Sequence, residues 1–430
     1  MFQRLIRWSP ILVFLAISLA PAAGAQENQV MVIKVNDVIT PAITEYITKS
    51  IEQANKEKAQ CLVIQLDTPG GLDLSMRDII KEMMGSDVPI VVYVAPSGAR
   101  AASAGALITL AADIAAMAPG SNIGAAHPVA MDGKMDRTMT EKVVNDAVAY
   151  IKSIAEKRGR NPKLAERMVT ESISITESEA LKMKVIDVVA KDLTDLLQKI
   201  DGRKVERPRG AIKLATKDAK VIVTEMGFRQ RLLATLSNPN IAYILMMIGL
   251  VGLYFELAHP GAIFPGVIGA ISLILAFFAF RTLPVNYAGV LLILLGVFLF
   301  IAEIKIASYG LLSVGGVVCL ALGSIMLFEA PAPYLRASLS VIIPTVIVTA
   351  GFCIIAMTLA LKAQMAKPAT GSEGMIGEIG VAQTPISPEG KVFVHGEFWN
   401  AYADQPIEAG EKVRVLKTEG LTLKVEKLKS

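Results

Sequence analysis

The stretch LVIQLDTPGG, residues 62–71, decides the fold of the first part of the chain. It begins as an aliphatic, β-branched run of the length of a buried strand and ends in a proline-glycine turn. Comparable runs lie at 30–35, 90–94 and 114–117, and amphipathic helical patterns separate them. Strands that alternate with amphipathic helices predict an α/β domain, which we place at residues 26–201.

A second glycine-containing segment follows the strand predicted at 90–94. Residues 101–105 of this segment read AASAG and lead into an apolar helical run. Ser103 is therefore expected at a helix N-terminus, where free N–H groups and the helix dipole favour developing negative charge. The neighbouring side chains are too small to block a substrate, so this setting suits a nucleophile. A serine that merely caps the helix is the alternative.

The turn at the end of the first stretch meets a second requirement of acyl transfer. Two adjacent glycines leave a backbone N–H free to point at an oxyanion, because no side chain restricts the approach. We assign the amides of Gly71 and Ala104 to an oxyanion hole and Gly70 to substrate binding. A simple strand-to-helix turn is the alternative for this glycine pair.

A serine nucleophile needs a base, and the chain contains three histidines, His127, His259 and His395. His259 lies at a predicted membrane boundary and His395 lies in the C-terminal part of the chain. Neither is expected to reach Ser103. His127 follows a strand-like segment and remains the histidine alternative.

Lys142 is the favoured base. Thr138 and Glu141 have capping-box spacing, which predicts that Lys142 lies in the first turn of a helix. The positive end of that helix and partial burial both favour a neutral amine. Asp146, four residues further on, would instead hold a protonated Lys142 in an ordinary surface pair. Lys134 is a competing base.

The chain is too apolar to be wholly soluble. Hydrophobic residues make up 53% of its 430 residues, and its mean hydropathy is +0.50. A polar connector at 202–240 precedes a predicted membrane domain at 241–361 of about five helices. The apolar stretches lie at about 241–258, 263–280, 285–302, 311–328 and 339–361. A glutamate and glycines recur in this domain at an offset of about 47 to 49 residues, which indicates a duplicated, closely packed hairpin.

Both ends of the chain differ from these domains. Residues 1–25 contain Arg4 and Arg7, an apolar stretch and a final AGA, which predict a secretory signal peptide. Export would place the first domain on the periplasmic or extracytoplasmic side, and an odd number of spans would leave the C-terminus in the cytoplasm. Residues 372–430 alternate aliphatic residues with glycines and predict a small five-stranded, OB-like β-barrel.

Charge and cysteine content exclude several classes. The net charge of +4 is small for this length, and the basic residues are scattered, so nucleic acid is not an expected partner. The three cysteines have no spacing that suggests a disulfide framework or a zinc site. No metal and no other cofactor is expected.

Together these segments resemble the NfeD family of membrane-bound ClpP-class serine proteases, in its long form. The resemblance rests on DTPGG at 67–71, AASAG at 101–105 and MAPG at 117–120 in the first domain, and on GKV at 390–392 and HGEFW at 395–399 in the barrel. It implies an α/β ClpP/crotonase-like domain, a multi-span α-helical membrane domain and a small all-β OB-fold domain.

The resemblance also implies the chemistry. In that family the serine of the small-residue motif is the nucleophile and a lysine on the following long helix is the base, which correspond here to Ser103 and Lys142. His127 directly precedes Pro128 and is shifted by one residue from the place of the histidine in soluble ClpP, which would turn it to the other strand face. The expected enzyme is a serine endopeptidase with a Ser-Lys dyad.

The implied substrate is a hydrophobic segment of a stomatin-like membrane protein. We expect the chain to form a homo-oligomer in the lipid bilayer of an inner or plasma membrane. A catalytically idle scaffold for stomatin-like proteins is the alternative from another functional class. An acyl-CoA hydratase of the crotonase fold is a weaker alternative, because no acidic pair accompanies the two oxyanion loops.

Overall fold

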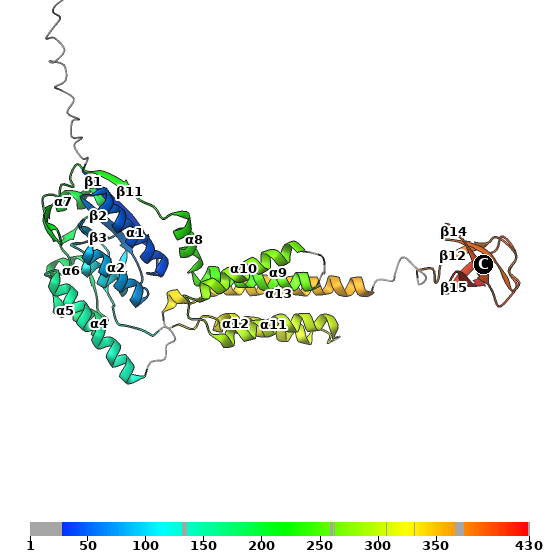
Figure 1. The fold of residues 1–430 in the computed structure, drawn as a ribbon. Helices are drawn as coiled ribbons and strands as arrows, with labels where there is room; N and C mark the ends of the chain where they lie inside the picture. The colour runs from blue at the N-terminus through cyan, green and yellow to red at the C-terminus, as the bar shows by residue number, and fades with distance from the viewer. Residues whose placement is uncertain are drawn as a thin grey trace, which may run out of the picture. The chain divides into compact units, whose positions relative to one another are not determined.

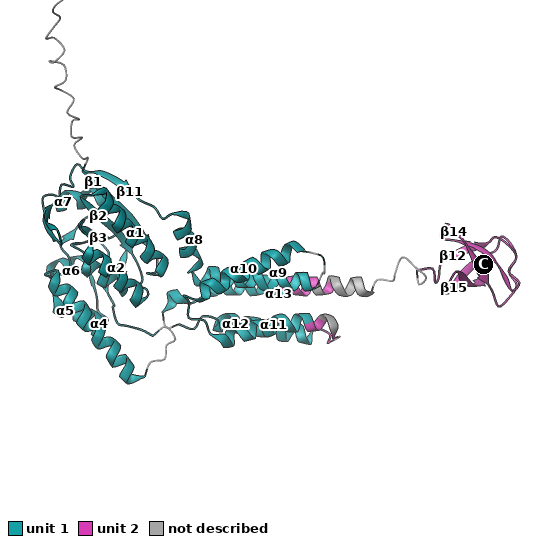
Figure 2. Ribbon diagram, viewed as in Figure 1, with its two compact units in different colours: residues 1–301, 310–350 teal, residues 302–309, 351–430 magenta. Residues whose placement is uncertain are grey.

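A computed structural model describes most of the chain. The described residues are 28–130, 136–258, 261, 263–306, 308–330, 332–365 and 374–428. The signal peptide predicted at 1–25 lies outside them. The chain divides into two compact units, residues 1–301 with 310–350 and residues 302–309 with 351–430 (Figure 2).

The first unit begins with an α/β domain, as predicted (Figure 1). Its strands are β1 (Gln29–Asn36), β2 (Cys61–Asp67), β3 (Ile90–Val94), β4 (Arg100–Ala102), β5 (Ile114–Met117), β6 (Asn122–Gly124), β7 (Ser174–Thr176), β8 (Val188–Val189), β9 (Lys204–Arg207), β10 (Gly210–Lys213) and β11 (Lys220–Val223). Its helices are α1 (Pro41–Glu57), α2 (Asp73–Gly85), α3 (Ala104–Ala111), α4 (Arg137–Lys157), α5 (Pro162–Thr170), α6 (Glu177–Lys182), α7 (Leu193–Ile200) and α8 (Phe228–Leu236).

A six-stranded parallel sheet forms the centre of this domain. Its strand order is β11-β1-β2-β3-β5-β8, and β4, β6 and β7 form a smaller sheet. Successive residues of β1 face opposite sides: Met31 and Ile33 join the core beneath α1 to α5, whereas Val30 and Val32 join the core beneath α7. Because both faces are covered, the strands are apolar along their length, which explains why they are recognisable in the sequence.

The predicted connector at 202–240 requires a correction. Its first half is part of the α/β domain, since β11 pairs in parallel with β1 at the edge of the main sheet and β9 and β10 form an antiparallel hairpin. The domain therefore extends past residue 201 to at least the end of β11. The polar composition of this segment misled the prediction, because an edge strand and a surface hairpin have one solvent-exposed side.

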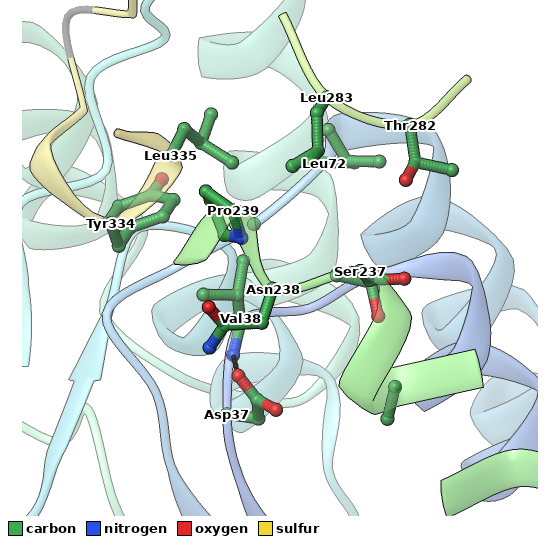
Figure 3. A pocket seen from close by; sticks show the side chains of 13 residues that line it. Asp37, Val38, Leu72, Ser237, Asn238, Pro239, Thr282, Leu283, Tyr334 and Leu335 are labelled. Carbon is green, nitrogen blue, oxygen red and sulfur yellow. Dashed lines mark hydrogen bonds between the residues drawn. The ribbon is translucent and has the colours of Figure 1, made fainter. Parts of the chain in front are cut away.

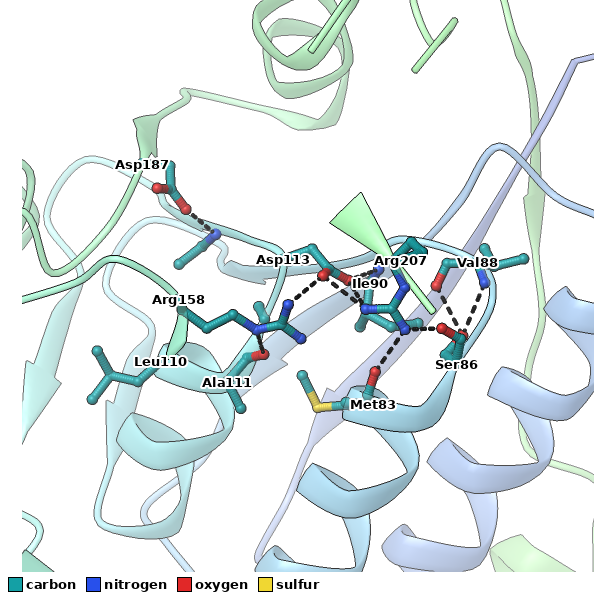
Figure 4. Close-up of polar contacts among 12 residues, drawn as sticks. Met83, Ser86, Val88, Ile90, Leu110, Ala111, Asp113, Arg158, Asp187 and Arg207 are labelled. Carbon is teal, nitrogen blue, oxygen red and sulfur yellow. Dashed lines mark hydrogen bonds and ion pairs between the residues drawn. The ribbon is translucent and has the colours of Figure 1, made fainter. Parts of the chain in front are cut away.

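A buried ion network fixes this segment to the domain (Figure 4). The guanidinium of Arg207, at the end of β9, donates to both carboxylate oxygens of Asp113 at 2.7 and 2.8 Å, and Arg158 donates to the same carboxylate at 2.6 Å. The side chains of Arg207 and Asp113 are each 1% exposed. Arg207 also donates to the carbonyl oxygens of Met83 and Ser86, at the end of α2. The network therefore joins β9, α2, α4 and the start of β5.

The described residues of the membrane domain form five apolar helices: α9 (Pro239–Ala258), α10 (Ile263–Phe280), α11 (Tyr287–Lys305), α12 (Leu311–Met326) and α13 (Leu339–Met365). A single 3-10 turn, η1 (Pro333–Leu335), precedes α13. Among the described residues, three stretches are long and apolar enough to cross a membrane, namely Pro239–Leu257, Ile263–Phe280 and Pro333–Ala356. The apolar parts of α11 and α12 are shorter.

Glycines allow two pairs of these helices to pack closely. A Cβ atom at Gly252 of α9 would lie 2.9 Å from the Cα of Gly269 in α10, and one at Gly323 of α12 would lie 2.7 Å from the carbonyl oxygen of Gly289 in α11. Both contacts are too short for any side chain. The two hairpins therefore use the same device, small residues at the crossing point, as the repeated glycines in the sequence indicate.

The second unit contains a closed five-stranded barrel, which confirms the prediction of a small all-β domain. Its strands are β12 (Ile379–Ala382), β13 (Glu389–Val394), β14 (Glu397–Tyr402), β15 (Lys412–Glu419) and β16 (Thr422–Lys427). Alternate residues such as Val413 and Val415 fill its core. Phe393 and Phe398 pack together on its surface with ring centroids 5.0 Å apart, and Phe398 is 69% exposed.

Candidate active site

The two glycine-containing segments meet at the carboxyl end of β2. Thr68, which is fully buried, forms a parallel bridge with Ala101: its N–H donates to Arg100 O at 2.8 Å, and its carbonyl accepts from Ala102 N at 3.1 Å. The Thr68 hydroxyl accepts from Gly70 N and donates to Gly70 O. This pairing holds the turn that contains Gly70 and Gly71 beside the loop that contains Ser103.

Ser103 is the residue between β4 and α3, at the predicted helix N-terminus. Its backbone is in a positive-φ conformation, with φ 52° and ψ −117°, that is unusual for a residue other than glycine. Hydrogen bonds from Ser103 N to Gly124 O and from Ala106 N to Ser103 O hold this conformation, each at 2.9 Å. The serine side chain makes no capping bond. The helix-capping alternative therefore does not account for Ser103, and a strained turn at a strand-to-helix junction is typical of an exposed nucleophile.

Both amides assigned to the oxyanion hole are free within the described part of the chain. Around Gly71, the bonds to Ile39 are made by the neighbouring Gly70 carbonyl and Leu72 N–H, so the Gly71 N–H itself donates to nothing. The Ala104 N–H is the first of α3 and has no partner either. Gly70 lies directly beside the serine, because a Cβ added to it would be 2.8 Å from Ser103 Cβ.

Lys142 lies on α4, two residues further into the helix than predicted. The helix begins at Arg137, and its N-cap is Asp136, whose carboxylate accepts from Met139 N at 2.8 Å. The predicted capping box of Thr138 and Glu141 is therefore wrong, since an aspartate two residues earlier already caps the helix. Because the helix field is strongest in the first turn, it acts less on Lys142 than expected.

The ion pair that we considered between Lys142 and Asp146 does not form. Asp146 instead pairs with Arg77 of α2, which also binds Asp73 at 2.8 Å and lies 4.4 Å from the centre of the Tyr150 ring. Lys142 is exposed and has no ion-pair partner among the described residues. Arg77 thus links α4 to α2, and it pairs with the Asp146 carboxylate that would otherwise bind Lys142. Sequence reasoning missed Arg77, which is 69 residues away from its partner.

The histidines lie elsewhere. The Nδ1 atom of His127 is 2.8 Å from the carbonyl oxygen of Val169, and its neighbours Ala126 and Pro128, but not His127, line the cleft described below. His395 is at the turn between β13 and β14, in the second unit. His259 and the competing base Lys134 fall outside the described residues.

One cleft of about 610 Å³ connects the predicted site residues. Gly71, Ser103, Ala104 and Lys142 all line it, whereas Gly70 is placed beside it through its contact with Ser103. Much of the remaining lining is apolar and was not predicted; it comprises Leu72, Leu74, Met76, Leu107, Val129, Val143, Ala332 and Leu335. No cluster of three or more His, Cys, Asp or Glu side chains suited to a metal occurs in the described part of the chain.

Three family models match successive parts of the chain. They are the N-terminal domain of NfeD1b at residues 29–224, the NfeD integral membrane domain at 240–359 and the NfeD-like C-terminal, partner-binding domain at 372–427. The first match ends just after β11, in agreement with the corrected domain boundary. The second covers α9 to α12 and most of α13.

Similar proteins share this organisation over nearly the whole length. The chain is 36% identical to the membrane-bound protease PH1510 of Pyrococcus horikoshii, over 98% of this chain and 97% of that protein. It is 28% identical to the membrane protein NfeD1b of Bacillus subtilis, over 94% of each. A solved structure, the 1510-N membrane protease specific for a stomatin homolog from P. horikoshii, is 35% identical and covers 48% of this chain and 98% of its own, with a TM-score of 0.43. This chain therefore belongs to the NfeD family, as a long-form membrane protein with a ClpP-like domain, a membrane domain and a C-terminal barrel.

Proposed function

We propose that the protein is a membrane-anchored serine endopeptidase in which Ser103 and Lys142 form a catalytic dyad. The observation that carries this proposal is the position of Ser103: a strained serine with a side chain free of capping bonds, on a cleft that Lys142 and the residues of two free amides, Gly71 and Ala104, also line. The 36% identity to a membrane-bound protease over nearly the full chain supports the same class of activity.

The proposed reaction is acyl transfer. Ser103 Oγ attacks the scissile carbonyl while Lys142 Nζ accepts its proton, and the N–H groups of Gly71 and Ala104 stabilise the oxyanion that forms. Lys142 then donates that proton to the leaving amine, and a water molecule hydrolyses the acyl-enzyme by the reverse sequence of proton transfers. A substrate strand that fills the cleft would exclude water from the lysine, and a dry environment favours the neutral amine that the first step needs.

The proposed substrate is a hydrophobic segment of a stomatin-like membrane protein. The apolar lining of the cleft supports an extended chain of aliphatic residues, and the similar P. horikoshii protein is described as specific for a stomatin homolog. The C-terminal barrel, which we assign to the OB-like class, would hold that partner. The family model that matches the barrel is that of a partner-binding domain, and the exposed Phe393 and Phe398 pair offers a small apolar contact surface.

The proposal also includes the placement of the molecule. The signal-like stretch at 1–25 supports an extracytoplasmic protease domain, and Lys362 and Lys367 after the last apolar stretch support a cytoplasmic barrel. We further propose that the chain acts as a homo-oligomer in an inner or plasma membrane.

A fluorophosphonate probe distinguishes the enzyme from an idle scaffold. The full-length chain in detergent micelles is expected to react covalently at Ser103, because the probe needs an activated serine beside an oxyanion hole. Mass spectrometry of the labelled peptide identifies the site, and Ser121, a buried serine of the same domain, provides the internal control. An unlabelled Ser103 in correctly folded protein would instead favour the scaffold.

Gly71→Ala tests the oxyanion hole. A Cβ atom at this position would lie 2.3 Å from the carbonyl oxygen and 2.6 Å from the Cα of Ile39, so the backbone must move and carry the Gly71 N–H with it. We expect the cleavage rate of an apolar peptide to fall about 10²- to 10³-fold, the effect of losing one oxyanion donor. Gly85→Ala is the matched control, since nothing lies within 4 Å of a Cβ there. Equal rates in both variants would remove Gly71 from the hole.

A further inference from the structure

The 3-10 turn η1, which leads into α13, lies at the proposed active site. Ala332, Tyr334 and Leu335 line the same cleft as Ser103 and Lys142, although they are more than 180 residues further along the chain. Tyr334 and Leu335 also line a second, smaller hollow of about 40 Å³ (Figure 3). Gly71 and Leu72 line both hollows, so η1 and the predicted oxyanion turn form the wall between them.

The Tyr334 hydroxyl is close to the nucleophile. A Cβ atom built on Gly70 would lie 3.3 Å from Ser103 Oγ and also 3.3 Å from the Tyr334 hydroxyl oxygen, so both oxygens border the same point above Gly70. Within the described part of the chain this hydroxyl forms no hydrogen bond. It is thus a free donor and acceptor at the place where the backbone of a bound substrate would pass.

Contacts from two other helices of the membrane domain hold the segments on either side of η1. Ser338 N donates to Asn240 Oδ1, at the start of α9, at 2.8 Å. Asn286, just before α11, donates from its backbone to Leu327 O at 2.9 Å and from its side chain to Glu329 at 2.7 Å. The position of Tyr334 therefore depends on the membrane domain rather than on the protease domain alone.

We propose that Tyr334 is a substrate-positioning residue that the membrane domain contributes to the active site. Its hydroxyl donates a hydrogen bond to a backbone carbonyl of the substrate, and its ring and Leu335 contact an apolar substrate side chain. The ligand is an extended apolar polypeptide segment that adjoins a membrane-spanning helix, because Tyr334, which orients it, lies at the start of a stretch of this chain that is long and apolar enough to cross a membrane. This inference rests on the proposed protease function and adds a source of specificity to it.

The test uses the full-length chain in lipid nanodiscs and an apolar peptide substrate. Tyr334→Phe, which removes only the hydroxyl, is expected to lower kcat/KM about 3- to 10-fold, the effect of one neutral hydrogen bond. Tyr334→Ala should lower it further, mainly through KM, because the apolar contact is lost as well. Tyr309→Phe is the matched control, since this tyrosine is fully exposed between α11 and α12.

A second readout separates positioning from folding and from the proposed function. The rate of Ser103 labelling by a small fluorophosphonate should stay within about twofold of the unsubstituted chain in both Tyr334 variants, because the probe has no peptide backbone or apolar side chain for Tyr334 to position. Unchanged kcat/KM in Tyr334→Ala would overturn the inference. Faster cleavage would also overturn it, because it would show that η1 obstructs substrate binding in the cleft. Lost labelling in the variants would show that Tyr334 only supports the fold. Cleavage that persists in Ser103→Ala would contradict the protease assignment itself.

Discussion

Ser103→Ala is expected to abolish cleavage of an apolar peptide by the full-length chain while the fold is retained. Alanine lacks the attacking oxygen, and Gly71 and Ala104 contribute only backbone to the site, so the substitution leaves the rest of the cleft unchanged. The expected loss is at least about 10³-fold, since removal of a covalent nucleophile leaves only binding and oxyanion stabilisation. Peptide turnover measured by mass spectrometry, with circular dichroism to verify folding, tests this. Persistent turnover would remove Ser103 from the mechanism.

The same assay identifies the base. Lys142→Ala is expected to reduce turnover about 10²- to 10⁴-fold, the usual contribution of general acid–base catalysis. His127→Ala is the matched comparison, because His127 is bound to the Val169 carbonyl and its side chain does not line the cleft. If the histidine variant were inactive and the lysine variant active, the dyad would be wrong. Lys142→Arg should not restore activity, because a guanidinium stays protonated.

The main sheet could be predicted from the sequence because each strand is apolar on both faces. The runs at 30–35, 62–66, 90–94 and 114–117 appear as β1, β2, β3 and β5 with ends that differ by at most one residue. The edge strand β11 could not be predicted in the same way. Its pairing with β1 and the anchoring of Arg207 of β9 at Asp113, 94 residues earlier, place the segment from β9 to β11 in the domain.

The part of the candidate site that is formed by backbone groups could be predicted from the sequence. The glycines and small residues around Ser103 and Gly71 are local features, and their geometry follows from the turn that they form. Side chains supplied by distant elements were not predictable. Arg77, which takes Asp146 away from Lys142, and Tyr334, which reaches the cleft from the segment before α13, depend on tertiary packing for which a single sequence contains no signal.

Asp113→Asn is expected to destabilise the protease domain by about 3–5 kcal/mol, the effect of breaking a buried ion pair by removing one partner. The amide has the same shape but no charge, and it would leave the guanidinium groups of Arg158 and Arg207 without their common counter-ion. The carboxylate also accepts from Ile90 N at 2.8 Å, so the start of β3 would lose an ionic partner as well. The change should therefore loosen β3, β5 and β9 together.

Hydrogen–deuterium exchange resolves this effect within a multidomain chain. Amides of β3 and β5 that exchange by global opening of the domain should exchange about 10²- to 4 × 10³-fold faster in Asp113→Asn, the same 3–5 kcal/mol at a factor of ten per 1.4 kcal/mol. Amides of the barrel, in the second unit, should not change, which provides a control within the same sample. Glu171→Gln, which breaks the exposed pair with Arg167, is the matched variant and should leave β3 and β5 protected. If Asp113→Asn also left them protected, the two arginines would have to be neutralised by other groups or by water. The connector segment would then be held by the pairing of β11 with β1 and by the bonds from Arg207 to the Met83 and Ser86 carbonyl oxygens.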